Sequence, residues 1–330
     1  MRLLLVAEMY PTGTVSAGAG AGTTAADFLL TPPDSRSAAL GNSGVADAES
    51  PFSLYNNPAL LSDAKSPLTL AGGVAEWPLG LQAQHYAVSS VWGTPADGPW
   101  GLGIFLSQWQ TAPIQATDIY GNANGRVRYT ARNVGLGLAH ALSPALHLGG
   151  AVKTISQRFE ETGRAGGNTG TGHSALAWDF GVAYDTPLKY VRVAAALQNT
   201  GNDVAFRQDQ EKLPRALRLG MQGAFFNRQF QWAAEGRKLS GGALAVKGGM
   251  GFRPFPNMIL RMGFDSGLRD IFLGVTTGVG FRLRNVDIDY AFVPLGNLGT
   301  TQRMTLAWRI GKTAPRTRNA ERPPSLWSAN

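Results

Sequence analysis

Histidines and carboxylates are the side chains of this chain whose types could do chemistry. The four histidines, His85, His140, His147 and His173, show no His-x-x-x-His spacing, so a metal site would need ligands from separate strands. The glycine-rich stretches GAGAG and GLG lack the strand, turn and helix setting of a nucleotide-binding loop. No Ser/His pair for nucleophilic catalysis is legible. The sequence therefore predicts a protein that is not an enzyme and binds neither a cofactor nor a metal.

Composition narrows the class of protein further. The 330 residues include no Cys, which excludes disulfides, thiol catalysis and Cys-ligated metals. Hydrophobic residues make up 44% and charged residues only 16%, and no run of eighteen apolar residues occurs, so a transmembrane helix is excluded. The net charge is +8, but the basic residues are dispersed along the chain, so nucleic acid is not an expected partner.

The elements that must position these side chains are strands with two unlike faces. In ALAVKGGMGF, Leu244, Val246 and Met250 alternate with Lys247 and small residues, and VDIDYAFV repeats this pattern. A soluble β-protein would also alternate, but its exposed face would carry many Lys and Glu. Here the polar face is mostly Gly and Ala with sparse charges. This favours an enclosed, crowded lumen and a large apolar face that meets lipid.

Segment lengths favour an outer-membrane barrel over the soluble alternative. Many of the strand candidates have about the ten residues of a tilted membrane span. Compact turns such as 227–228 and 284–285 alternate with long connections, as in outer-membrane barrels. The sequence thus predicts a transmembrane antiparallel β-barrel of about fourteen strands in the bacterial outer membrane. The predicted strands are 67–76, 80–91, 100–108, 127–141, 145–159, 173–185, 190–199, 214–226, 229–238, 242–253, 257–265, 270–283, 286–293 and 301–310.

Four stretches in order resemble the PorV/PorQ family of outer-membrane barrels. They are SRSAALGNSGVADAESPFSLYNNPALLS, WDFGVAYDTPLKYVRVAAALQNTGN, EKLPRALRLGMQGAF and VDIDYAFVPLGNLGTTQRMTLAW. The chain departs from the family pattern at Asn42-Ser43 and Leu60, where Gly is commoner. The resemblance implies a FadL-type barrel of fourteen strands with an N-terminal plug. The expected organisation is a signal-like leader at 1–26, the plug at 27–63, the barrel at 64–310 and a disordered basic tail at 311–330.

The plug motif explains why a short segment rich in small residues precedes the strands. A barrel of this size is too wide to be filled by its wall side chains alone. Small plug residues would let the plug backbone pack closely against the wall, and Pro58 would set a turn that directs Ala59 and Leu60 into the first strand. The alternative is that Asn57-Pro58 merely starts that strand. The predicted motif residues are Leu40, Gly41, Gly44, Asn57, Pro58 and Ala59.

Alternation also places a set of charged side chains on the lumen face. We expect them to form a network that holds the barrel shape and pairs with the plug, with ligand binding as the alternative. The set is Asp179, Arg218, Lys247, Arg261, Asp287, Asp289, Arg303 and Arg309. Trp77, Trp92, Trp100 and Trp109 lie near predicted strand ends, where they are expected in a headgroup girdle, with packing or partner contacts as the alternative.

Two functions remain open. The PorV/PorQ resemblance implies a component of protein secretion or surface attachment that binds exported protein domains or secretion machinery, through long loops at 109–126, 160–172 and 200–213. The alternative is a FadL-like channel for long-chain fatty acids or other hydrophobic small molecules. A channel should have an apolar pocket along the plug, for which Phe52, Leu54 and Tyr55 are candidates, and a gap in the wall. In either case the outer-membrane lipid is a partner.

Overall fold

The computed structural model describes residues 25–93, 98–117, 120, 122–163, 169–202, 204–206, 209–268, 274–295 and 299–311. The predicted leader and basic tail lie almost wholly outside these residues, and so do parts of the long loops at 109–126, 160–172 and 200–213. Within the described residues, no helix is long and apolar enough to cross a membrane.

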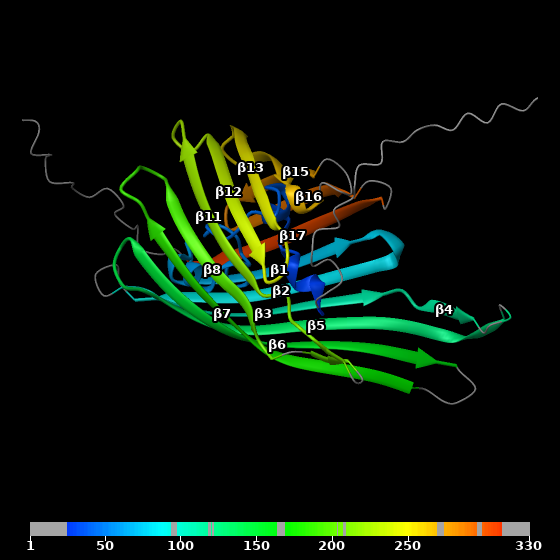
Figure 1. Ribbon diagram of the computed structural model, residues 1–330. Coiled ribbons are helices and arrows are strands. Elements are labelled where there is room, and N and C mark those ends of the chain that lie inside the picture. Colours follow the sequence, from blue (N-terminus) through cyan, green and yellow to red (C-terminus); the bar gives the residue numbers. More distant parts are fainter. Residues whose placement is uncertain are drawn as a thin grey trace, which may run out of the picture.

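Fourteen antiparallel strands form a closed barrel, which confirms the predicted fold (Figure 1). The ring closes because β1 pairs with β17 and β3 pairs with β5. The wall strands are β1 (Leu68–Glu76), β2 (Leu81–Trp92), β3 (Trp100–Thr111), β5 (Ala123–Ala141), β6 (Leu146–Thr162), β7 (Thr169–Asp185), β8 (Arg192–Gly201), β11 (Ala216–Phe225), β12 (Phe230–Leu239), β13 (Leu244–Phe255), β14 (Met258–Asp265), β15 (Val275–Leu283), β16 (Val286–Pro294) and β17 (Thr300–Ile310).

The two ends of the barrel differ. Turns such as 226–229 and 284–285 join neighbouring strands at one end, which we call the short-turn end. The long-loop end carries the short strand β4 (Ile114–Thr117), the hairpin of β9 (Val204–Phe206) and β10 (Asp209–Glu211), and the turns η3 (Pro78–Gly80) and η4 (Ser266–Leu268). Strands β5, β6 and β7 run past the rest of the wall there (Figure 1). In outer-membrane barrels the short turns face the periplasm.

Side-chain direction follows the predicted alternation. Leu244 and Met250 on β13 are 61% and 55% exposed on the outer face, whereas Lys247 between them is 3% exposed in the lumen. The same inside-out pattern, with large apolar side chains outside, repeats around the ring, for example at Leu219 and Trp308. A soluble protein would bury such side chains, so this surface is suited to lipid.

The segment predicted as a plug runs inside the barrel, where Figure 1 shows it in blue. We call residues 25–66 the inner segment. It contains η1 (Asp27–Leu30), α1 (Ser35–Ala39), α2 (Ser53–Asn56) and η2 (Pro58–Asp63). Side chains cap the start of two of these elements: Asp34 accepts a hydrogen bond from the Ser37 amide at 3.0 Å, and Asn57 accepts one from the Ala59 amide at 3.1 Å.

Pro58 corrects a sequence prediction. It is the first residue of η2 and neither starts a strand nor directs Ala59 and Leu60 into one, because β1 begins only at Leu68. The proline instead suits the first position of a helical turn, where its missing amide proton costs nothing. Residues 58–62 therefore stay buried inside the barrel and lie against β3, β5, β6 and β7.

Candidate functional site

A packed cluster of aromatic side chains, which we call the aromatic chamber, lies in the lumen on the long-loop side. Trp109 of β3 is only 3% exposed, and Trp77 at the end of β1 packs with it, their ring centroids 5.5 Å apart. The girdle prediction is therefore wrong for these two residues. Trp109 shares its face of β3 with Ser107 and Gly103, so strand parity would have placed it inside.

The other two tryptophans face outward. Trp92 and Trp100 are 47% and 40% exposed, and Trp100 stacks on His140 with centroids 4.1 Å apart. Both lie at the short-turn ends of their strands, where an indole fits the lipid headgroup boundary.

The chain itself places an aromatic ring in the chamber. The ring centroid of Phe28, from η1, lies 6.2 Å from that of Trp109, and the ring centroid of His85 lies 5.8 Å from it. The Ser107 hydroxyl is the hydrogen-bond partner of both Trp109 and His85. It accepts the Trp109 indole N–H at 3.1 Å and lies 2.8 Å from His85 Nδ1. The other members of the cluster are mainly apolar: ring faces, Leu81 and the methyl groups of wall alanines. The exception is the Trp77 indole N–H, which is buried without a hydrogen-bond partner among the described residues. Such a chamber suits a flat apolar group.

The rest of η1 fills the space beside the chamber. Leu29 belongs to an apolar cluster with Ile155 and Leu213. The Tyr55 hydroxyl donates to the Leu29 carbonyl at 2.9 Å, and burial, with the Asp179 carboxylate nearby, raises the pKa of Tyr55, so the hydroxyl stays a neutral donor. Of the predicted pocket residues, Tyr55 thus contacts η1. All three, Phe52, Leu54 and Tyr55, belong to a cluster with Phe105 and Leu61. The Phe52 ring also lies 6.3 Å from that of His85, centroid to centroid.

Two arginines hold the chain just after η1. Arg237 of β12 donates to the Leu30 carbonyl and Arg303 of β17 to the Pro32 carbonyl, both at 3.0 Å. The Nε atoms of both lack a hydrogen-bond partner among the described residues. The Arg303 guanidinium also lies 5.0 Å from the Trp77 ring. Arg303 therefore places a cation beside the aromatic chamber, and Arg237 holds the end of η1.

The predicted lumen charges all face inward. Four of them donate to carbonyls of the inner segment, namely Arg218, Lys247, Arg303 and Arg309. Most also pair with a charge on the wall. Asp179 accepts from Lys153 at 2.7 Å, Arg218 from β11 donates to Glu235 at 2.7 and 2.8 Å, and Arg261 donates to Asp289 at 2.6 Å. Further contacts join Lys247 to Asp265 at 3.6 Å and Asp287 to both Arg282 and Arg309 at 2.7 Å. Arg303 stands apart at the chamber. Sequence reasoning missed Lys153, Asp265 and Arg282, although the alternation along their strands would have placed them on the lumen face.

Each residue of the predicted plug motif lies at a contact with the wall. Gly41 donates its amide to Thr276 Oγ1 at 3.1 Å, and the Gly44 amide donates to Glu235 at 2.9 Å. Asn57 donates to the carbonyls of Val182 and Ala195, each at 3.2 Å. Leu40 lies against Gly249 and Gly263, and Pro58 and Ala59 lie against Gly149. Their role in anchoring stays a prediction.

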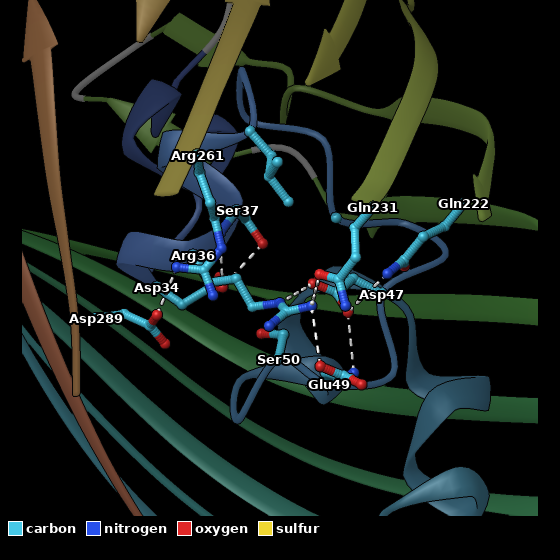
Figure 2. Close-up of polar contacts among 12 residues, drawn as sticks. Asp34, Arg36, Ser37, Asp47, Glu49, Ser50, Gln222, Gln231, Arg261 and Asp289 are labelled. Carbon is cyan, nitrogen blue, oxygen red and sulfur yellow. Dashed lines mark hydrogen bonds and ion pairs between the residues drawn. The ribbon is translucent and has the colours of Figure 1, made fainter. Parts of the chain in front are cut away.

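A second site, made of charged side chains, lies in the inner segment toward the short-turn end. Figure 2 shows Arg36 of α1 between Asp47, at 2.5 Å, and Glu49, at 3.2 Å. Burial by itself would lower the pKa of Arg36, but these two carboxylates raise it above its ordinary value. For the Glu49 carboxylate, burial by itself would raise the pKa, because it disfavours the charged form. The cations Lys65, Arg36 and Arg282 nevertheless hold the pKa of Glu49 well below its usual range. Arg36 and Glu49 are therefore both charged at neutral pH.

Comparison with solved structures identifies the fold. Neither a protein-family model nor a curated protein matches the chain. The toluene transporter TbuX of Ralstonia pickettii is similar with a TM-score of 0.62 at 16% identity, over 86% of this chain and 99% of that one. The monoaromatic hydrocarbon channel CymD gives 0.57 at 12%, over 86% and 98%. A FadL homologue of Pseudomonas aeruginosa gives 0.55 at 10%, over 83% and 97%. The chain has a FadL-like barrel fold.

The fold and the lipid-facing surface together place this FadL-like barrel in the bacterial outer membrane. Among the described residues, no group of three His, Cys, Asp or Glu side chains could hold a metal ion.

The wall has no gap in its strand pairing, although a channel was expected to show one. Every neighbouring pair of described wall strands is joined, with bulges only between Trp178 and Phe180 and between Phe252 and Phe255. The outer face of β7, β8 and β11 to β13 is instead hollowed by about 620 Å³, over small residues such as Ala234 and Gly236.

Proposed function

We propose that this protein is a non-enzymatic outer-membrane channel for small hydrophobic molecules, and that the aromatic chamber is their binding site in the lumen. The observation that carries the proposal is the position of Phe28. Its ring, which belongs to the inner segment and not to the wall, lies against Trp109 in a chamber of apolar faces. A site that accepts a phenyl side chain should accept a free molecule of the same shape.

The chemistry of the lining defines the ligand class. Removing the apolar area of one small ring from water is worth about 2 kcal/mol, and contacts between ring faces add about 1 kcal/mol. Aromatic hydrocarbons would bind through apolar burial and ring-face contacts alone. A long-chain fatty acid could in addition place its carboxylate near Arg237 and Arg303, whose Nε donors lack partners. The similarity to a toluene transporter and a monoaromatic hydrocarbon channel supports the general class.

The role in secretion or surface attachment stays a prediction from the PorV/PorQ resemblance. The similar structures are a transporter and channels, which favours the channel hypothesis. Recognition of exported domains would use the long loops, parts of which lie outside the described residues.

Ligand binding to the purified full-length barrel tests the channel hypothesis. We expect toluene or oleate to bind saturably by calorimetry, and Trp109→Ala to weaken binding by about tenfold or more, since it removes the largest ring face. Trp92→Ala, on the outer face, is the matched control. If neither ligand binds, or if a deletion strain loses secreted proteins but keeps its uptake of both compounds, the channel hypothesis is wrong.

A further inference from the structure

Two parts of the inner segment close the short-turn end, and they do so in different ways. The η2 half lies tightly on wall glycines. A Cβ atom on Gly149 would lie 2.5 Å from the Ala59 amide nitrogen, and one on Gly181 would lie 1.9 Å from Asn57 Oδ1. Residues 58–62 are fully enclosed. This half has no room to move without breaking backbone-level packing.

The other half is closed by residues 46–50, which we call the latch loop. Cavities flank it: one of about 90 Å³ lined by Asp63, Arg192 and Arg228, and one of about 30 Å³ lined by Arg253, Arg261 and Asp289. Two alanines, Ala46 and Ala48, are the loop's aliphatic side chains, and Ala48 is only half-buried. Apolar packing therefore contributes little to the position of this loop.

Charge holds the latch loop instead. The Glu49 carboxylate contacts cations from four separate parts of the chain: Arg36 of α1 at 3.2 Å, Arg253 of β13 and Arg282 of β15 at 3.7 Å each, and Lys65 before β1. A fifth cation, Arg309 of β17, donates to the Glu49 carbonyl at 2.8 Å.

Carboxylates complete the surroundings of the loop. Asp47 accepts the Glu49 amide at 3.0 Å and pairs with Arg36. Asp287 pairs with Arg282 and Arg309, and Asp289 pairs with Arg261. Since every other carboxylate near Glu49 already has its own partner, Glu49 is the carboxylate of the latch loop that pairs with the cations of strands β13 and β15.

We propose that Glu49 is an electrostatic latch that keeps the short-turn mouth of the barrel closed, and that the latch loop is the movable part of this closure. The inference rests on the proposed function, because a channel needs an exit. It places that exit beside the latch loop, between η2 and the wall from β12 to β17. Removing the Glu49 charge leaves several cations facing one another across the mouth, which favours an outward position of the loop.

Thiol labelling gives a direct test, because the chain contains no natural cysteine. Ala48→Cys places one thiol on the latch loop, and Ala59→Cys places one within η2 as the matched control. In a Glu49→Gln background we expect a water-soluble maleimide to label position 48 at least about tenfold faster, because a lost charged hydrogen-bond partner changes an equilibrium by that factor or more. Labelling at position 59 should not change. Unchanged labelling at position 48, or an equal increase at both positions, would overturn the proposal.

Ion conductance across planar bilayers gives a second readout of the full-length protein. Glu49→Gln should raise conductance, whereas Glu160→Gln, at an exposed ion pair near the long-loop end, should not. Heat-modifiable gel migration shows whether each variant is folded. If Glu49→Gln raises conductance but no ligand binds, the channel function is contradicted and the latch is supported. If a ligand binds but Glu49→Gln leaves conductance and labelling unchanged, only the latch is contradicted.

Discussion

Phe28 of the inner segment and Trp109 of the wall lie 6.2 Å apart, centroid to centroid, although they are remote from each other in the sequence. Their contact joins η1, a short turn of the inner segment, to β3, a wall strand that is paired on both edges. A ligand that enters the chamber must compete with this contact.

Phe28→Ala should therefore tighten the binding of aromatic ligands. Removing the ring abolishes an internal competitor, and we expect affinity to rise by about three- to tenfold, in contrast to the loss expected for Trp109→Ala. Calorimetry with toluene on the purified barrel measures the change. Phe226→Ala, on a 72% exposed residue of the short-turn end, is the control. Equal losses in Phe28→Ala and Trp109→Ala would show that Phe28 is part of the site and not its competitor.

Gly181→Val should prevent η2 from docking. The new side chain would coincide with the Asn57 amide, which also donates to the Val182 and Ala195 carbonyls. We expect the free energy of unfolding to fall by about 3 kcal/mol or more. The temperature at which the folded, fast-migrating form is lost on a gel reports this. Gly72→Val, on an open outer position, should migrate like the wild type.

The buried pair of Lys153 and Asp179 should behave as a unit. Their side chains are 4% and 1% exposed, and Asp179 also accepts the Asn199 amide at 2.7 Å. Asp179→Asn leaves a buried ammonium without its counterion, so we expect a loss of about 3 kcal/mol in denaturant unfolding. Lys153→Met combined with Asp179→Asn should recover part of it. A double variant less stable than both single variants would contradict this coupling.

Acid should loosen the latch loop through Glu49. Its pKa is lowered in the folded state, so its contribution to stability is complete above the ordinary carboxylate pKa of about 4.3 and is lost as pH falls through the lower folded value. Labelling of Ala48→Cys by a pH-tolerant thiol reagent should therefore rise between pH 5 and pH 3. In the Glu49→Gln background the rate should already be high and change little. The same pH dependence in both backgrounds would exclude Glu49 as its cause.

The period-two alternation determined much of this protein by itself, because it is a local property of extended chain. It placed Leu244 toward lipid and Lys247 in the lumen, and the predicted strands match the fourteen observed ones closely. The same parity rule would have placed Trp109 inside, had it been applied in preference to the aromatic-girdle expectation. Turn lengths likewise distinguish the two ends of the barrel from the sequence alone.

Only the tertiary structure decided which lumen side chains meet. Arg218 faces the lumen by parity, but its pairing with Glu235 depends on the register of β11 and β12, and that of Arg36 with Glu49 depends on the path of the inner segment. Phe28 reaches Trp109, and Glu49 reaches β13 and β15, through contacts between residues remote in sequence. Closure of the ring and the route of the chain within it set such contacts, and no local periodicity encodes either.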